Sequence, residues 1–299
     1  INEAGDVGGT VWVGGNSTHA FVLRNGVKTV LDNLGGAWGN AYGIDPQGRV
    51  LGWSGQADGE LIPVVWTDVT PTPLKSPGRY ASVHAGNLAG VHVGAAWRHD
   101  QQVALRWSRA GRPSELGSLG GGASYAAAIN RAGVIVGAAT DASGTYRAFR
   151  HDGAGMQDLG TLVPGLASHA TAINRHGEVV GVADVSATAQ RAVRFTDSGV
   201  VDLGTLGGDD ARALGLNDRG DVVGESTFGD LDHPWRTRAL LVRNGRMHNL
   251  QSLLQPQDQA LWHLTTAESI NNAGQIMARA RAPGTGYYDA VLVRLDPVD

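Results

Sequence analysis

The stretch Ile173-Asn174-Arg175-His176-Gly177, which leads into the apolar run Val179-Val180-Gly181, decides the fold because the chain repeats it. Seven copies share an Asn or Asp in second place and a Gly in fifth place. They begin at Ile1, Ile44, Gly86, Ile129, Ile173, Leu216 and Ile270, so successive starts lie 43, 42, 43, 44, 43 and 54 residues apart. A fixed period of this length predicts a solenoid, a propeller or an array. We call the five-residue unit the repeat motif.

Each repeat divides into four short strand-like runs separated by turn residues. In the fourth repeat these runs cover residues 124–129, 134–138, 147–150 and 156–162. The repeat motif suits a tight turn between the first two runs, because an Asn or Asp side chain bonds the backbone two residues on and Gly accepts a positive φ. The continuous apolar run that follows the motif suits a strand buried on both faces.

Helical periodicity is nearly absent from the 299 residues. Four strands in each repeat predict an all-β fold, namely a seven-bladed β-propeller of four-stranded antiparallel blades that forms one domain over residues 1–299. The first repeat lacks its leading run and the last lacks its closing run, so 26 strands are expected. Six blades with a spare hairpin is the alternative count, and an open solenoid of short parallel coils is the alternative fold.

Composition excludes several classes of protein. The formal net charge is -4, which leaves no basic surface for nucleic acid. No apolar stretch approaches the roughly 18 residues of a membrane-spanning helix, so membrane insertion is not expected. Cysteine is absent, which removes disulfides and thiolate metal sites. The two incomplete terminal repeats argue against a long array, and we expect a monomer.

Six of the eight tryptophans map to one face of the predicted propeller, which we call the upper face. The repeat-motif turns lie on the opposite face and are short and regular, whereas the upper loops vary. Trp66 and Trp107 fall on third strands and are expected to pack inside their blades. Aromatic side chains around a concave mouth are typical of a ligand pocket, and the alternative is that they pack loops against blades. The six are Trp12, Trp38, Trp53, Trp97, Trp235 and Trp262.

A second set of candidates alternates along the leading strand of each repeat, which is the run before the repeat motif. These residues are expected to face a central funnel, because every second side chain of a strand points to the same side. Together they could supply an acid, a base and charge stabilisation. The alternative is a water-filled channel whose polar lining serves solvation alone. The candidate catalytic residues are Tyr42, His84, Tyr125, His169, Arg212 and Glu268.

The sixth repeat carries two enlarged segments, residues 227–238 and 251–264, which hold the length beyond the usual period. Long loops in an economical scaffold are usually functional or disordered, and aromatic content argues against disorder. We expect these segments to form a partial lid over the funnel, with a decorative insertion as the alternative. The candidate ligand-binding residues are Trp38, Trp53, Trp97, His233, Trp235, Arg236, Trp262 and His263.

No metal site and no cofactor are expected. The ten histidines are scattered without the spacing of metal ligands. Asp209-Asp210 and Asp230-Leu231-Asp232 could hold Ca²⁺ between neighbouring loops, although solvated loop acids are the commoner case.

Three stretches resemble a known bacterial repeat. His19-Ala20-Phe21, the run from Asp202 to Gly208, and Ala172-Ile173-Asn174 look like the HAF-repeat family. That family is described as extracellular, so the resemblance implies a secreted or cell-surface protein. The chain begins at Ile1 without Met, and we expect that an upstream segment was removed by signal cleavage or by trimming. Only the first repeat keeps His-Ala-Phe intact, and the family carries no catalytic signature to transfer.

Three classes of function remain open, because a fold does not determine a function. The first is a propeller that binds a small molecule or a saccharide in an aromatic-rich funnel on its upper face. The second is an enzyme of lyase, cyclase or hydrolase type that performs acid–base chemistry in that funnel. The third is a structural or adhesive surface protein. No His-Glu-x-x-His, Walker or Gly-x-Ser-x-Gly sequence supports catalysis, so binding is the preferred prediction.

Overall fold

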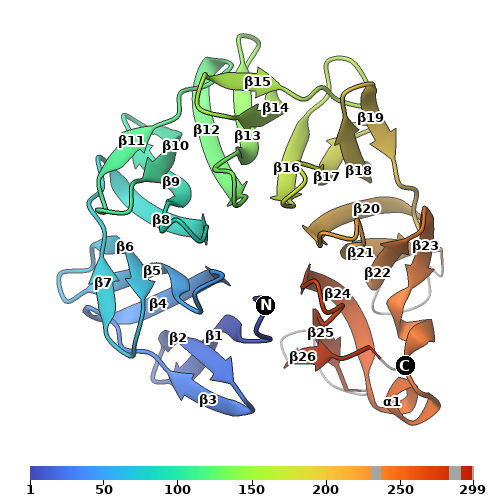
Figure 1. Cartoon of the computed structure of the whole chain (residues 1–299), viewed down its shortest axis with the longest axis horizontal. Helices are drawn as coiled ribbons and strands as arrows, with labels where there is room; N and C mark the ends of the chain where they lie inside the picture. Colours follow the sequence, from blue (N-terminus) through green and yellow to red (C-terminus); the bar gives the residue numbers. More distant parts are fainter. Residues whose placement is uncertain (230–236, 283–290, 298–299) are drawn as a thin grey trace. The chain divides into compact units, whose positions relative to one another are not determined.

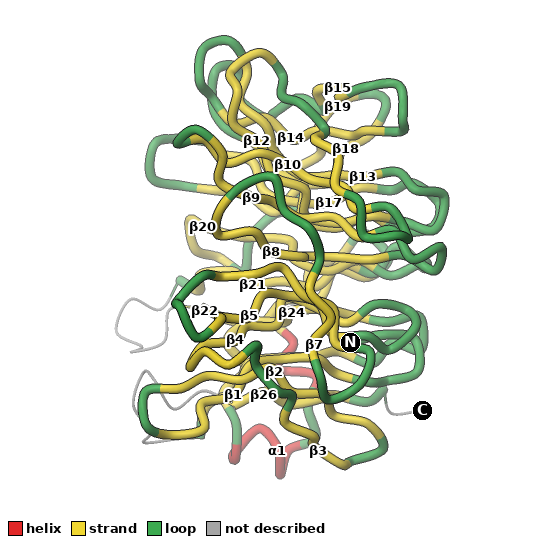
Figure 2. The backbone as a smooth tube through the Cα atoms, turned by 90° about the vertical axis from the view of Figure 1, so that its left-hand side faces the viewer, coloured by secondary structure: helices red, strands yellow, loops and turns green. Residues whose placement is uncertain are grey.

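The computed structural model describes residues 1–229, 237–282 and 291–297. Strands dominate these residues, and the helical segments are the 3-10 turn η1 (Leu250–Leu253) and the helix α1 (Pro256–Leu261). Figure 2 shows the preponderance of strand, with helix near α1. The described residues form 26 strands, the number expected from the sequence. The prediction of an all-β chain is therefore confirmed.

The chain divides into two compact units, Ile1–Asp158 and Leu159–Asp299. The first unit holds the first four repeats. Their strands are β1 (Val7–Gly14), β2 (Ser17–Arg24) and β3 (Val27–Val30); β4 (Gly35–Ile44), β5 (Val50–Gln56), β6 (Leu61–Trp66) and β7 (Pro71–Pro73); β8 (Arg79–Gly86), β9 (His92–Arg98), β10 (Gln101–Trp107) and β11 (Pro113–Glu115); and β12 (Gly120–Ile129), β13 (Ile135–Asp141), β14 (Tyr146–His151) and β15 (Met156–Asp158).

The second unit holds the last three repeats. Their strands are β16 (Ser168–Ile173), β17 (Val179–Asp184), β18 (Gln190–Thr196) and β19 (Gly199–Asp202); β20 (Gly207–Leu216), β21 (Val222–Phe228), β22 (Thr237–Arg243) and β23 (Arg246–Asn249); and β24 (His263–Ile270), β25 (Ile276–Arg281) and β26 (Val291–Leu295). The helical segments η1 and α1 lie between β23 and β24. A single domain over both units stays a prediction.

Within each repeat the strands pair as antiparallel neighbours in chain order. The second to sixth repeats each give four strands, and the last gives three. One parallel pairing, Thr18 with Trp38, joins the strands of the first repeat to β4. Antiparallel sheets built one per repeat are the blades of a β-propeller. The predicted fold class is thus confirmed, while the number of blades stays a prediction.

The leading strands of each unit lie beside one another. In the first unit β8 lies next to β4 and β12, and in the second unit β20 lies next to β16 and β24. The last strands of the repeats, such as β7 and β11, form the opposite edges of their sheets (Figure 1). Polar residues on neighbouring leading strands are therefore brought together within each unit.

The repeat motif forms the turn that the sequence predicts. In the sixth repeat, Oδ1 of Asn217 accepts hydrogen bonds from the backbone N–H groups of Arg219 and Asp221, each at 3.0 Å. Gly220, in fifth place, has a φ of 80°, in the left-handed region that favours glycine.

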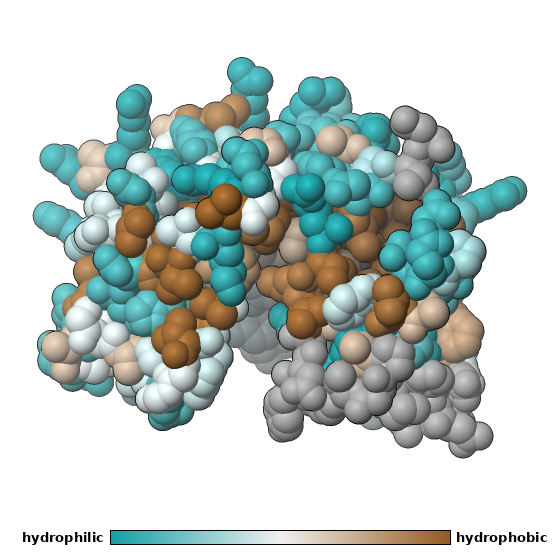
Figure 3. Space-filling view, turned by 90° about the horizontal axis from the view of Figure 1, so that it is seen from below, coloured by the Kyte–Doolittle hydropathy of each residue, from teal (hydrophilic) through white to brown (hydrophobic). Residues whose placement is uncertain are grey.

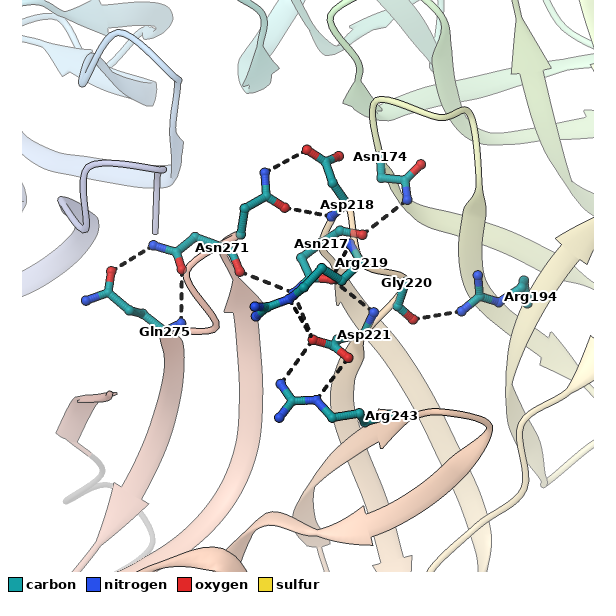
Figure 4. Close-up of polar contacts among 11 residues, drawn as sticks. Asn174, Arg194, Asn217, Asp218, Arg219, Gly220, Asp221, Arg243, Asn271 and Gln275 are labelled. Carbon is teal, nitrogen blue, oxygen red and sulfur yellow. Dashed lines mark hydrogen bonds and ion pairs between the residues drawn. The ribbon is translucent and has the colours of Figure 1, made fainter. Parts of the chain in front are cut away.

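The same asparagine also joins consecutive sheets, which the sequence did not indicate. Nδ2 of Asn174 donates to the carbonyl oxygen of Asn217 at 3.1 Å, and Nδ2 of Asn217 donates to that of Asn271 at 3.3 Å. Figure 4 shows these three residues in succession. In the first unit, Asn87 donates to the carbonyl oxygen of Asn130 at 3.1 Å. We call this set of contacts the asparagine ladder.

The cores lie between consecutive sheets, where second and third strands are buried. Trp66 and Trp107 are 1% and 0% exposed. Their indole N–H groups donate to the carbonyl oxygens of Asp32, at 2.8 Å, and Lys75, at 2.6 Å, in the preceding connections. The prediction that these two tryptophans are buried in the packing of the blades is confirmed, and each packs between its own sheet and the preceding one.

Candidate functional site

A β-bulge sets the direction of the residue two places before each repeat motif. The pairing of β8 with β9 skips His84, and the pairing of β16 with β17 skips Thr171. The neighbouring strand supplies a glycine where the backbones approach. A Cβ on Gly181 would lie 1.9 Å from the carbonyl oxygen of His169. A bulge re-aims a side chain away from the regular ladder, so these positions are freed for contacts outside their own sheet.

His84 uses that freedom to join two sheets. Its Nδ1–H donates to the carbonyl oxygen of Ala126 on β12 at 2.8 Å, and its Nε2 accepts from the Ser82 hydroxyl at 2.8 Å. The carbonyl acceptor fixes the tautomer. Burial lowers the pKa of His84 below its usual value, which favours the neutral ring. The imidazole is thus neutral with both nitrogens occupied, and Tyr42 packs on it with ring centroids 4.8 Å apart.

The same position in the fifth repeat shows that this contact belongs to the scaffold. The Thr171 hydroxyl donates to the carbonyl oxygen of Ala213, on the next leading strand, at 2.8 Å. His84 and Thr171 therefore perform the same task with different side chains. This equivalence favours a positioning role for His84 over the predicted catalytic one.

A connected polar cluster occurs on the leading strands of the second unit. Burial lowers the pKa of His169, the negative charge of Asp184 opposes that effect, and the positive charge of Arg212 adds to it. The Arg212 guanidinium faces the Glu225 carboxylate with Nη1 and Oε1 3.5 Å apart. The Thr266 hydroxyl donates to the other oxygen of Glu225 at 2.7 Å. Contacts thus join Arg212, Glu225 and Thr266, and the charge of Arg212 acts on His169 of the neighbouring leading strand.

Sequence reasoning missed Glu225, which lies on β21 directly opposite Arg212. The signal was available, because an acid on a second strand opposite a basic residue on the leading strand forms a cross-strand pair. Two other candidates have different neighbours. Glu268 is ion-paired with Arg279, and the Tyr125 ring lies 6.3 Å from that of Tyr146.

The exposed tryptophans of the first unit lie at strand ends remote from the repeat-motif turns. Trp12, near the end of β1, and Trp38, near the start of β4, are 59% and 39% exposed. Their rings meet edge to face with centroids 6.3 Å apart. Trp97 is exposed near the end of β9, and Trp53 is half-buried within β5. We call Trp12 and Trp38 the tryptophan pair.

Backbone contacts hold the tryptophan pair in place. The Ser17 hydroxyl donates to the carbonyl oxygen of Ala37 at 2.6 Å, and the Thr18 hydroxyl donates to that of Gly39 at 3.0 Å. These bonds flank Trp38 on both sides. A further exposed aromatic residue, Tyr80, has a φ of 49°, which is rare for a bulky side chain and marks local strain. The sequence did not single out Tyr80.

The enlarged sixth repeat is described in part. His233, Trp235 and Arg236 lie outside the described residues, so the prediction of a lid over residues 227–238 is not addressed. The second enlarged segment contains η1 and α1, where the sequence predicted loop. Trp262 follows α1, is half-buried and packs against the core of the last sheet. His263 is half-buried at the start of β24.

Metal-binding and membrane features can be stated for the described residues alone. Within them, no group of three or more His, Cys, Asp or Glu side chains is placed to hold a metal ion. The Asp210 carboxylate accepts a backbone N–H from Gln190 at 2.9 Å, and residues 230–232 lie outside the described ranges. None of the helices in the described ranges has the length and apolar character to cross a membrane.

No family model and no curated protein matches this chain. Its fold is similar to that of TolB from Acinetobacter baumannii, at 12% identity and a TM-score of 0.57 over 82% of this chain and 63% of that one. It is also similar to puromycin hydrolase, at 16% identity and a TM-score of 0.59 over 91% of this chain and 48% of that one. The chain spans less than two thirds of either protein. At such identity the likeness shows the fold alone, which is a β-propeller.

Proposed function

We propose that this propeller binds a small molecule or a saccharide through the exposed aromatic edge of its first unit. The tryptophan pair carries the proposal. Two large indoles held edge to face at a strand end expose apolar surface that a folded chain normally covers. Indoles combine a flat apolar face with an N–H donor, which suits the apolar face and hydroxyl groups of a sugar ring.

Rigidity supports binding at this edge. The Trp38 backbone is held by the pairing of Thr18 and by the two hydroxyl contacts on either side. A preorganised site loses little conformational entropy when a ligand binds. The candidate acid and base groups, in contrast, are engaged with protein partners, as the two nitrogens of His84 and the ion pair of Glu268 illustrate. Binding therefore accounts for the exposed residues better than catalysis does.

The proposal extends to location and architecture. The resemblance of His19-Ala20-Phe21 to the HAF repeat supports a secreted or cell-surface protein, where saccharides are common ligands. Seven blades around a funnel would place the leading-strand residues below the aromatic edge.

Isothermal titration calorimetry with glucan and chitin oligosaccharides and with small aromatic compounds tests the proposal. We expect one of these classes to bind, and Trp38→Ala to weaken that binding by about tenfold or more, as for an aromatic hot spot. Val27→Ala, which removes an exposed residue on β3 in the same sheet, is the matched control and should change nothing. Equal affinity in the Trp38→Ala and Val27→Ala variants would refute the assignment.

Acid–base catalysis is the second candidate, and the cluster around His169 is the observation that favours it. His169 is half-buried, and burial lowers its pKa, with opposite contributions from the charges of Asp184 and Arg212; a histidine in such surroundings has the character of a general base. Chromatography of each bound compound after prolonged incubation separates the two functions. Product formation that His169→Asn abolishes would establish an enzyme, and unchanged compound would leave binding alone.

A further inference from the structure

A cavity of about 340 Å³ opens beside β26 in the second unit. Residues of β26 and Leu264 near the start of β24 line one side of it, and residues of η1, α1 and their flanking segments line the other. Figure 3 shows hydrophobic residues on the surface of the last sheet, where Val291 and Leu292 are exposed. The lining is mostly apolar with a polar rim: Leu253, Leu254, Trp262, Leu264, Val293 and Leu295, then Gln255, Asp258, Arg294 and Asp296.

The second and third repeats carry a larger side chain at the equivalent place. Leu295 pairs with Ile276 on the second strand, as Trp66 pairs with Val50 and Trp107 pairs with His92. Leu295 thus takes the third-strand position that is tryptophan in the second and third repeats. There the indole is fully buried, and its N–H bonds a carbonyl oxygen of the preceding connection. In both repeats the space at this position is therefore shaped to hold an indole ring, and we call this space the slot.

The cavity beside Leu295 is larger than a cavity beside one of these indoles. Beside Trp66, the corresponding cavity, which Val22, Leu31 and Val50 also line, holds only about 110 Å³. Beside Leu295 it is about three times larger. Small-molecule sites begin at roughly 300 Å³, so the larger cavity accommodates a bicyclic ring.

The polar rim specifies the charge of a ligand. Asp296 is already neutralised, because Gln275 donates to it at 2.6 Å and Arg294 lies 3.3 Å from it. The half-buried carboxylate of Asp258, on α1, has no partner among the residues that the structure describes. An ammonium group would neutralise Asp258, and the Trp262 ring on the same wall would add a cation–π contact.

We propose that this cavity is a second binding site, specific for arylalkylamines, in which a bicyclic ring fills the slot beside Leu295 and its ammonium group pairs with Asp258. The site shares no residue with the tryptophan pair, so it stands or falls independently of the function proposed above.

Titration with tryptamine, followed by calorimetry and by ligand-observed NMR, tests the site on the full chain. Leu295→Trp should fill the cavity and lower the affinity for tryptamine at least tenfold, while thermal unfolding stays the same or rises. Asp258→Asn should lower the affinity about fivefold, the upper range for a solvent-accessible ion pair. Asp100→Asn, which removes an acid in the turn between β9 and β10, should leave the affinity unchanged.

Neutral indole separates the contribution of the ring from that of the charge. We expect the native chain to bind indole more weakly than tryptamine. The affinity for indole should be the same in the native chain and in the Asp258→Asn variant. Undetectable tryptamine binding, or unchanged binding in a folded Leu295→Trp variant, would overturn the proposal. If Leu295→Trp does not fold, undiminished tryptamine affinity in Asp258→Asn overturns it instead.

Discussion

The asparagine ladder makes a quantitative prediction at Asn217, which is 3% exposed. Replacing Asn217 by Asp preserves shape and the two acceptor contacts of Oδ1. It removes the Nδ2 donor that binds the carbonyl oxygen of Asn271 at 3.3 Å and the Asp221 carboxylate at 3.0 Å. The variant therefore removes one of the two hydrogen bonds that the carbonyl oxygen of Asn271 accepts, the other coming from the Gly274 N–H at 3.0 Å, and it sets two carboxylates against each other.

Two terms determine the magnitude. The loss of one hydrogen bond to a carbonyl that keeps its other donor costs about 0.5–1.5 kcal/mol. Two negative charges about 3 Å apart repel by up to roughly 5 kcal/mol at an effective dielectric constant of 20. Arg219 and Arg243 lie 3.5 Å and 3.0 Å from Asp221 and offset part of this repulsion. We expect Asn217→Asp to lower the free energy of unfolding by about 3–5 kcal/mol.

Asn87→Asp provides the matched control, because it removes the same donor without adding the repulsion. Asn87 is also 3% exposed, and its Nδ2 binds the carbonyl oxygen of Asn130 at 3.1 Å. The residue four places on is Val91 rather than an acid. The expected cost is therefore about 0.5–1.5 kcal/mol, from the one lost hydrogen bond, because the Asn130 carbonyl oxygen still accepts from the Gly133 N–H at 3.1 Å.

Urea unfolding at pH 7, with equal slopes checked between variants, measures both costs. The excess for Asn217→Asp should shrink as the pH falls towards 4, because protonation of one carboxyl relieves the repulsion. Equal costs for the two variants at pH 7 would refute the reasoning about charge. No cost in either variant would refute the ladder as a source of stability.

Two further predictions concern groups buried in the first unit. Trp107→Leu should lower the free energy of unfolding by about 2–4 kcal/mol, as large-to-small core changes do, and chemical unfolding measures this loss. The pKa of His84 is lowered in the folded state, so the unfolded chain takes up a proton at a higher pH than the folded chain does. The free energy of unfolding therefore decreases as the pH falls below 6.5. His84→Gln should therefore flatten the decline of the melting temperature between pH 7 and pH 5, and an unchanged decline would contradict the prediction.

The sequence was sufficient for the local features of the fold. The turn at Asn217 and the strand after it depend on residues within one repeat, so periodicity and turn chemistry predict them. The inter-sheet role of the same asparagine was out of reach, because its acceptor lies 54 residues away at Asn271. Contacts between repeats depend on how sheets face each other, which no single repeat encodes.

The candidate site was predicted less well, and His84 shows why. Alternation along a strand placed it correctly among polar positions of the leading strands. Its role depends on the bulge that skips it and on the carbonyl oxygen of Ala126, 42 residues on. A polar residue that sequence alone makes a catalytic candidate can prove to be a structural one once its hydrogen-bond partner in the next repeat is known. Glu225 shows the converse, because its importance appears only when it is set opposite Arg212.

Departures from the repeat fall into two kinds, and the difference indicates where function lies. Asp45 replaces the ladder asparagine but is compensated, because Arg49 pairs with it at 2.6 Å. Burial alone would raise the pKa of Asp45, yet hydrogen bonds from His92 and Arg49 hold it below its usual value. Such a departure costs the fold little and requires no external partner.

Leu295 and the tryptophan pair are departures of the second kind, because nothing in the described residues compensates them. Leu295 borders a cavity where the second and third repeats bury an indole, and Trp12 and Trp38 are exposed indoles that meet edge to face. Each costs stability relative to a chain with a filled slot or a polar edge. The ligands proposed above would cover the exposed indoles and fill the cavity, and their binding would offset this cost.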